Sequence, residues 1–284
     1  MKNKISNRTS AKIFVDLLIR NGCRNACIAP GSRNLPLTEA LIKSPIKCYS
    51  YIDERSMCYF ALGLAKSLNE PVAIVTTSGT ATANLLPGIT EAKISNIPLI
   101  AITADRPKRL ISTGTPQTIT QNNMFGSFVN KAIDIKDCGS KSIKKIYKCL
   151  EKSYKNSPGP VHINFRFEEP IYDDYNNLDY NMPEASFKSI EINKRLVLEN
   201  FKRPMIICGG INPNAKTNQI AALAKKINAP ILADVFSQMR HNSNKNGLIY
   251  YQQYINKLNP DLILRFGYKP VSKALNDFLD KNKR

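Results

Sequence analysis

The sequence predicts an α/β fold built on an open parallel sheet with helices on both faces. Two observations lead to this prediction. Short, continuously apolar runs recur along the chain, as expected for strands that are buried on both faces. Segments with apolar residues at helical spacing alternate with these runs, which is typical of strand–helix–strand units. With 284 residues, the chain is long enough for more than one domain.

The first part of the chain supplies most of these elements, and the run PVAIVTT at 71–77 has the clearest strand pattern. Turn residues such as Asn21 with Gly22, or Pro30 with Gly31, end several of them. The strands are predicted at 25–29, 48–52, 71–77, 98–103 and 159–165. The helices are predicted at 10–20, 37–43, 57–68, 81–95 and 143–156, the last after a long irregular stretch.

The composition changes after this first series. An acidic stretch that is rich in Asn and Tyr and lacks periodicity predicts a linker. Beyond it, strands are predicted at 204–208, 230–234 and 261–265, with helices at 217–227 and 271–279. The predicted organisation is therefore a first domain at 1–170, a linker at 171–192, and an incomplete second α/β domain at 193–284 with about three strands.

The composition indicates in which cellular compartment the protein is expected. The chain contains no run of about 18 apolar residues, so no membrane-spanning helix is predicted. Its N-terminus is basic but lacks the apolar segment of a secretory signal, and we expect a cytoplasmic protein. The seven cysteines are irregularly spaced and form no C-x-x-C motif, which favours small buried side chains in a reducing compartment.

The net charge is +19, from 41 Lys and Arg against 22 Asp and Glu. A basic module that binds nucleic acid is one interpretation of this charge. The lysines are scattered over every segment, however, and aromatic residues are not interleaved with them in one block. We therefore expect no nucleic-acid partner and no membrane partner, although a positive field would attract anionic small molecules.

Four successive predicted strands end in polar or charged residues. These ends are PGSR at 30–33, DERS at 53–56, TSGT at 77–80 and ADRP at 104–107. In open parallel sheets, ligands bind beyond the carboxyl ends of the strands. Three of the four ends contain an arginine, which can bind a carboxylate or phosphate through two parallel hydrogen bonds. The sequence thus predicts one site for an anionic ligand.

Other chemistry has little support in the sequence. Neither His162 nor His241 lies in a metal-binding pattern, and His162 inside a predicted strand favours a structural role. No metal ligand is predicted. The motifs G-x-S-x-G, G-x-x-x-x-G-K-[ST] and G-x-G-x-x-G are absent. Gly209 and Gly210 follow a strand and could approach a phosphate, but they are also typical of a plain turn.

Several distinct strings occur in a fixed order: APGSRNLPL at 29–37, DERS at 53–56, FALGLAK at 60–66, TSGTA at 77–81 with AN at 83–84, TADRP at 103–107, PQTITQ at 116–121 and RFGYKPVSKAL at 265–275. Together they closely resemble the family of 2-succinyl-5-enolpyruvyl-6-hydroxy-3-cyclohexene-1-carboxylate (SEPHCHC) synthases, which are thiamine-diphosphate enzymes. The resemblance implies a pyrimidine-binding domain followed by part of a middle domain, from an enzyme with three domains.

The activity that the resemblance implies is a transferase reaction that depends on thiamine diphosphate. 2-Oxoglutarate loses CO₂ and is joined to isochorismate, which gives SEPHCHC in menaquinone or phylloquinone biosynthesis. Both substrates are dicarboxylates, in keeping with the arginines at the strand ends. The resemblance also implies a cytoplasmic homodimer or tetramer that uses Mg²⁺.

The same resemblance assigns roles to individual residues. Glu54 matches the glutamate that hydrogen-bonds N1′ of the aminopyrimidine ring and so promotes removal of the proton at C2 of the cofactor. An apolar helix start beside Glu54 would favour its protonated form. Asp53 and Ser56 are expected to begin the helix instead. The other matched positions are Thr77 and Ser78 near the cofactor ring, Gln117 at the reacting centre, and Ser32, Arg33, Arg106, Gln117, Gln121 and Lys273 in the substrate site.

The sequence departs from the family in one respect. Thiamine-diphosphate enzymes hold Mg²⁺ and the diphosphate with a Gly-Asp-Gly…Asn motif in a C-terminal domain, and no Gly-Asp-Gly occurs here. We therefore expect a fragment that lacks this domain, is inactive alone and binds the cofactor weakly. The alternatives are a carboligase of the acetolactate-synthase kind, a basic non-enzymatic binding module, and a catalytically dead relative.

Overall fold

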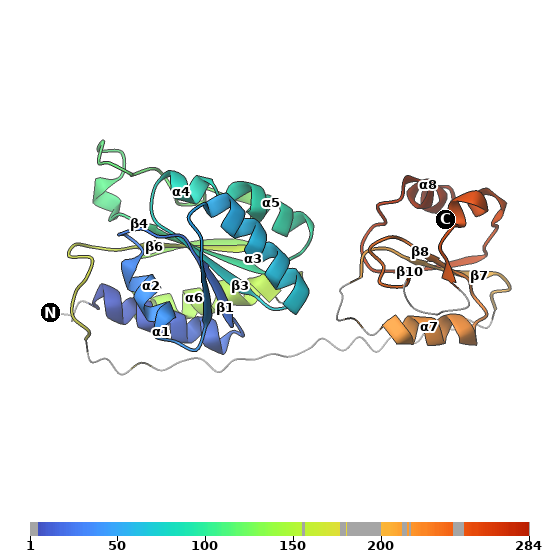
Figure 1. Cartoon of the computed structure of the whole chain (residues 1–284), viewed down its shortest axis with the longest axis horizontal. Helices are drawn as coiled ribbons and strands as arrows, with labels where there is room; N and C mark the ends of the chain where they lie inside the picture. The colour runs from blue at the N-terminus through green and yellow to red at the C-terminus, as the bar shows by residue number, and fades with distance from the viewer. Residues whose placement is uncertain are drawn as a thin grey trace. The chain divides into compact units, whose positions relative to one another are not determined.

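The chain divides into two compact units, residues 1–187 and 188–284, and each is described here by itself (Figure 1). The computed structural model describes residues 5–154, 157–176, 180, 200–211, 215, 217–240 and 247–283. The linker predicted at 171–192 lies mostly outside the described residues. The predicted domain boundaries therefore stay predictions.

The first unit is organised around a sheet that, over the described residues, has six strands in the order β2-β1-β3-β4-β6-β5. Every strand pair in it is parallel. The strands are β1 (Asn25–Ile28), β2 (Lys47–Ser50), β3 (Val72–Thr76), β4 (Leu99–Asp105), β5 (Lys131–Ile135) and β6 (Val161–Arg166). The strand order changes direction between β1 and β3, which is where open sheets of this type bind ligands.

Helices cover both faces of this sheet, as predicted (Figure 1). Apolar side chains of α1 (Asn7–Arg20), α2 (Leu35–Ile42) and α6 (Ser140–Tyr154) pack into one core cluster on one face. Those of α3 (Glu54–Leu68) and α5 (Leu86–Ile94) pack into a second cluster on the other face. The predicted α/β class with an open parallel sheet is confirmed.

Three local features differ from the predictions. The helix predicted at 81–95 is two helices, α4 (Thr80–Ala83) and α5, because Pro87 lies in the first turn of α5 and disfavours a continuous helix before it. Strand β5 lies in the stretch predicted to be irregular. It lacks a continuous apolar pattern because it is a short edge strand with charged residues on both faces. Helix α3 begins three residues before the predicted start, and the Asp53 carboxylate accepts a hydrogen bond from the Ser56 amide at 2.7 Å.

In the second unit, the described residues form a parallel sheet of four strands in the order β10-β7-β8-β9, one more strand than predicted. The strands are β7 (Pro204–Cys208), β8 (Ile231–Ala233), β9 (Gly247–Leu248) and β10 (Leu262–Phe266). Strand β9 has only two residues, too few for a periodic pattern. Helices α7 (Thr217–Lys226) and α8 (Lys273–Lys281) pack into separate core clusters. Short 3₁₀ helices lie at Lys108–Leu110, Gly126–Phe128, Tyr251–Gln253 and Ile255–Lys257.

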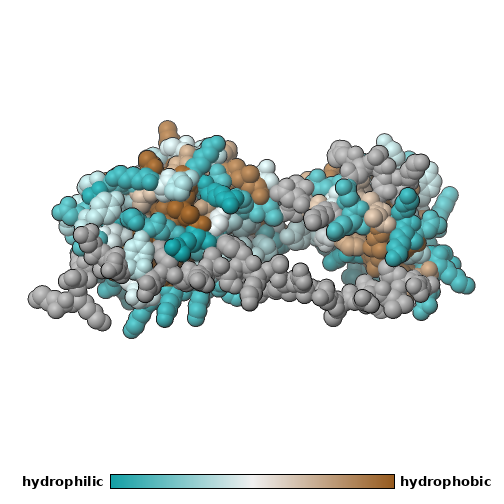
Figure 2. All heavy atoms as spheres, turned by 90° about the horizontal axis from the view of Figure 1, so that it is seen from below, coloured by the Kyte–Doolittle hydropathy of each residue, from teal (hydrophilic) through white to brown (hydrophobic). Residues whose placement is uncertain are grey.

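The protein has polar side chains on much of its surface (Figure 2) and cysteines mainly in its interior. On the face seen in Figure 2, hydrophilic side chains are spread over both units and surround smaller apolar areas. All seven cysteines are free thiols, and six of them are buried, which agrees with the predicted role as small apolar residues. No helix among the described residues has the length and apolar character needed to cross a bilayer.

Candidate active site

The predicted site lies where the chain leaves β1 and β3. A Cβ atom added to Gly31 would lie 2.3 Å from the Cβ of Thr77, so the two segments approach each other more closely than any larger residue would permit. Thr77 and Ser78 are buried there, whereas Ser32 is exposed. The structure therefore brings the PGSR and TSGT strand ends together, as the parallel sheet predicted.

Ser78 and Gln117 join this strand end to the loop after β4. The Ser78 hydroxyl donates to the Gln117 carbonyl oxygen at 3.1 Å, and Gln117 Nε2 donates to the Ser78 carbonyl oxygen at 3.2 Å. Gly79 has φ +84°, and a Cβ there would lie 3.0 Å from Gln117 Cγ. A glycine is thus needed at 79 for its left-handed backbone and for the close approach of Gln117.

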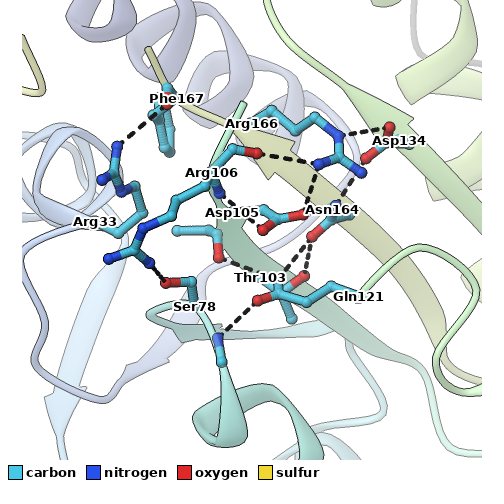
Figure 3. A network of polar contacts seen from close by, with 12 residues as sticks. Arg33, Ser78, Thr103, Asp105, Arg106, Gln121, Asp134, Asn164, Arg166 and Phe167 are labelled. Carbon is cyan, nitrogen blue, oxygen red and sulfur yellow. Dashed lines mark hydrogen bonds and ion pairs between the residues drawn. The ribbon is translucent and has the colours of Figure 1, made fainter. Parts of the chain in front are cut away.

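Arg106 is the central cation of the site (Figure 3). Its Nη1 donates to the Ser78 hydroxyl oxygen at 2.7 Å and to the Gln117 carbonyl oxygen at 2.8 Å. Partial burial, together with the positive charge of Arg33, lowers the pKa of Arg106. The negative charges of Asp105 and Glu169 offset part of this effect, so the site combines two cations with two carboxylates of the chain itself.

Arg33 is 9% exposed although it carries a charge. Its Nη1 donates to the Phe167 carbonyl oxygen at 3.3 Å, and its Nη2 lies 2.8 Å from the Glu169 carboxylate. The Glu169 side chain is 57% exposed. Arg33 thus binds a carboxylate here, and that carboxylate comes from a solvent-exposed residue of the same chain.

Glu54 lies in the first turn of α3 and is half-buried. Its Oε2 accepts a hydrogen bond from Asn84 Nδ2 at 3.0 Å. Its other carboxylate oxygen has no hydrogen-bond partner within the part of the chain that the structure describes. The local geometry therefore fits a glutamate that offers one oxygen to a ligand. The sequence assigns no role to Asn84. This exposed residue lies at the break between α4 and α5, and its amide contacts the start of α3.

Gln121 and Lys273 are the remaining predicted substrate residues. Gln121 is fully buried, and its amide bonds to the protein: Oε1 accepts from the Gly79 amide at 2.8 Å and Nε2 donates to the Ala104 carbonyl oxygen at 3.1 Å. Gln121 thus lies behind the surface of the site. Lys273 is exposed at the start of α8 in the second unit, so its role as a substrate ligand stays a prediction.

His162 has the structural role that the sequence predicted. It is completely buried, its Nε2 lies 2.8 Å from the Thr103 hydroxyl, and its ring meets the edge of Phe125. Burial lowers the pKa of His162 to about 4, so the imidazole is neutral near pH 7. Among the described residues, no group of three or more His, Cys, Asp or Glu is placed to hold a metal ion.

Comparison with protein families gives this geometry a context. Residues 8–124 match the model described as "Thiamine pyrophosphate enzyme, N-terminal TPP binding domain". This range is therefore similar to the N-terminal domain of thiamine pyrophosphate enzymes. The matched range contains the predicted site residues of the first unit, from Ser32 to Gln121, and it ends before β5 and β6. The six-stranded parallel sheet agrees with the α/β fold predicted for this domain.

The thiamine pyrophosphate enzyme domain belongs to a longer region of similarity. The chain is 32% identical over 306 residues to the 2-succinyl-5-enolpyruvyl-6-hydroxy-3-cyclohexene-1-carboxylate synthase of Chlorobium phaeobacteroides, a match that covers 97% of this chain and 52% of that protein. It is 38% identical over 283 residues to the synthase of the same name from Staphylococcus aureus, covering 94% of this chain and 51% of that protein. The chain thus spans about half the length of the curated relatives it matches.

Proposed function

We propose that this chain forms the part of a SEPHCHC synthase that binds the pyrimidine ring of thiamine diphosphate and the carboxylates of the substrates. The reaction is a transfer in which 2-oxoglutarate loses CO₂ and is joined to isochorismate. The support comes from the thiamine pyrophosphate enzyme domain, from the two synthases that share 32% and 38% identity with the chain, and from the site geometry.

One observation carries the choice of substrate class: Arg33 and Arg106 face each other at the carboxyl ends of the strands (Figure 3). Arg106 uses a single nitrogen, Nη1, for its hydrogen bonds to Ser78 and Gln117, which leaves the remaining donors of its guanidinium for a ligand. Arg33 already binds the exposed Glu169 carboxylate, and a substrate carboxylate can take the same position. A dicarboxylate substrate therefore suits this pair.

The chain also fits the aminopyrimidine end of the cofactor. When bound, thiamine diphosphate supplies an electron sink for the carbon that loses CO₂. Glu54 would hold the hydrogen bond to the ring nitrogen through its unpartnered oxygen, while Asn84 fixes the other oxygen. Thr77 and Ser78 would line the ring. Because the described residues offer no metal cluster, we assign no Mg²⁺ ligand to them.

Arg106, Ser78 and Gln117 would orient the substrate rather than exchange protons with it. The guanidinium and the hydroxyl are held within one hydrogen-bonded triangle, so their directions are set before a ligand arrives. Such preorganisation lowers the entropic cost of bringing two substrates together. The exposed Gln117 side chain is the polar group of this triangle that can reach the reacting centre.

The product of the complete reading frame that contains this sequence provides the test. It is incubated with thiamine diphosphate, Mg²⁺, 2-oxoglutarate and isochorismate, and separately with pyruvate alone. We expect SEPHCHC from the first mixture and no acetolactate from the second. Acetolactate without SEPHCHC would favour a carboligase of the acetolactate-synthase kind, and neither product from a folded protein that binds the cofactor would contradict both functions.

The cytoplasmic location and the homodimeric or tetrameric state are part of the same proposal. Sedimentation of the complete product measures the oligomer directly. A monomer at working concentration would contradict that part alone.

A further inference from the structure

The sheet of the first unit contains a polar strip that the proposed function does not use. All six residues of β6 are buried, yet alternate positions carry His162, Asn164 and Arg166 on one face. A strand buried on both faces is normally apolar throughout. The register places these side chains beside polar residues of the neighbouring strands: Thr103 and Asp134 flank Asn164, and Asp105 flanks Arg166.

Asn164 is the centre of this strip (Figure 3). Its Nδ2 donates to Asp105 Oδ2 at 2.8 Å and to Asp134 Oδ1 at 2.7 Å. Its Oδ1 accepts from the Thr103 hydroxyl and from Gln121 Nε2, both at 2.9 Å. Two donors and two acceptor sites are the full capacity of an amide, so the Asn164 side chain is completely satisfied and held in one orientation.

One branch of the network leads to the Ser78 side of the site. Gln121 connects Asn164 to the backbone amide of Gly79, through Nε2 at one end and Oε1 at the other. Gly79 follows Ser78 directly, and its left-handed backbone is one that glycine adopts readily, so the contact with Gln121 selects one of several accessible conformations. Gln121 thereby ties the turn after β3 to β6.

The second branch leads to Arg106. Asp105 Oδ1 accepts from the Arg106 amide at 2.8 Å, and Arg166 Nη1 donates to the Arg106 carbonyl oxygen at 3.0 Å. Arg166 also forms ion pairs with Asp105 at 2.9 Å and with Asp134 at 2.8 Å. Both backbone groups of Arg106 are thus held by side chains of the buried strip.

We infer that Gln121 and Asn164 are positioning residues that fix the backbone on both sides of the anion site, so that Ser78, Arg106 and Gln117 meet a substrate carboxylate in the correct geometry. The inference rests on the proposed function for the identity of the ligand. It gives Gln121 a role behind the site in place of direct substrate contact. A fully satisfied buried network rigidifies the groups that it joins, which suits a positional role for this strip.

The first test substitutes Gln121→Met in the complete product. Methionine has a similar length but makes none of the three hydrogen bonds of the amide. We expect the KM for a dicarboxylate substrate to rise about 10-fold to 100-fold, because a small misplacement of a binding group has effects of this size. The melting temperature should fall as well, because the Gly79 amide, the Ala104 carbonyl oxygen and Asn164 Oδ1 each lose a partner. The control Ser153→Ala removes a buried hydrogen bond on α6 and should lower the melting temperature without changing KM.

A second measurement requires no substrate. Hydrogen exchange of the peptides that contain Gly79 and Arg106 should accelerate in Gln121→Met and stay unchanged in Ser153→Ala. This readout still decides the inference if the reaction proposed above is wrong. Gln121→Glu keeps the acceptor for the Gly79 amide, and its carboxyl, which burial favours in the protonated form, can donate to one of the two oxygens that Gln121 Nε2 contacts. It should therefore restore slow exchange at Gly79 at least in part.

Two outcomes would overturn the inference. A lower melting temperature with unchanged KM and unchanged local exchange in the folded protein would show that Gln121 only stabilises the fold. A fall in kcat at unchanged KM and unchanged exchange would show that Gln121 contacts the reacting atoms. Should Gln121→Met fail to fold, the same measurements on Gln121→Glu decide between these outcomes.

Discussion

Glu54 and Arg106 both follow the carboxyl end of a parallel strand, but the protein holds them differently. Among the residues that the structure describes, the Glu54 carboxylate has one hydrogen bond, from Asn84, and it lies half-buried at the start of α3. Arg106 is fixed at its side chain by Ser78 and Gln117, and at its backbone by Asp105 and Arg166. This difference fits the proposed roles, in which Glu54 offers an oxygen to the cofactor ring and Arg106 orients an anion in a fixed geometry.

The largest effect on kcat is expected from a substitution of Glu54. Glu54→Gln removes the acidic group and should lower kcat of the complete product by about 10²–10⁴-fold, the range typical of general acid–base groups. Stability should change little, because one partly exposed hydrogen bond is lost or rearranged. Steady-state kinetics and thermal unfolding measure the two quantities.

Glu54→Asp is the matched control, since it keeps the charge but is shorter by one methylene. A near-normal kcat for Glu54→Gln would show that Glu54 takes no part in the chemistry. It would also contradict the proposed difference between Glu54 and Arg106.

The next effect concerns Arg106. Arg106→Lys keeps the charge but cannot contact Ser78, Gln117 and a carboxylate through one planar group. We expect KM for the dicarboxylate substrates to rise about 10-fold to 100-fold, from the loss of a charged hydrogen bond worth about 1.5–3 kcal/mol. Initial-rate kinetics at varied substrate concentration checks this.

Arg109→Lys offers the control, because Arg109 pairs with Glu168 at the surface. An equal change in KM for the two variants would indicate a general effect of charge rather than a fixed site.

The stability of the fold is expected to depend on pH through the buried His162. Burial lowers the pKa of His162 to about 4 in the folded protein, while the unfolded chain keeps the usual value near 6.5. The stability from a neutral His162 is therefore complete above pH 6.5 and is lost as the pH falls from 6.5 to 4, by up to about 3 kcal/mol. Urea unfolding of the chain between pH 7 and pH 4.5 measures this loss.

The variant His162→Gln should flatten the curve in this window. The Glu39 carboxylate provides an internal reference, because hydrogen bonding to Arg8 lowers its pKa to about 2 and its contribution is lost only below about pH 4.5. A curve for His162→Gln that falls as steeply as the wild type would contradict the assignment.

The smallest effect is expected for Asn84→Ala. This change removes the hydrogen bond from Asn84 to the Glu54 carboxylate, and kcat should fall about 2-fold to 10-fold, as for a hydrogen bond worth about 0.5–1.5 kcal/mol. KM for the dicarboxylates should stay constant, because Arg33 and Arg106 are unaffected. A change in KM without a change in kcat would place Asn84 on the substrate side instead.

The elements that the sequence predicted correctly are those with a strong local cause. Strand β3 is a continuous apolar run between turn residues, and Asp53 has the short acidic side chain that accepts from the first helical amides. Strand β5 is missed by the sequence prediction because its residues form a strand by pairing with β6. Helix α6 separates the two strands in the chain. The site residues were predicted from strand ends and a family resemblance, and their roles stay proposals.

The sequence by itself determined the parallel α/β fold, the strand ends that meet at one edge, and the excess of arginine there. These properties depend on local periodicity and on the rule that parallel strands end at the same edge. Only the tertiary structure decided that Gln121 is buried, that Asn84 contacts Glu54, and that Asn164 joins three strands and a loop. Hydrogen bonds between segments distant in the chain depend on their spatial arrangement, which no local pattern of residues records.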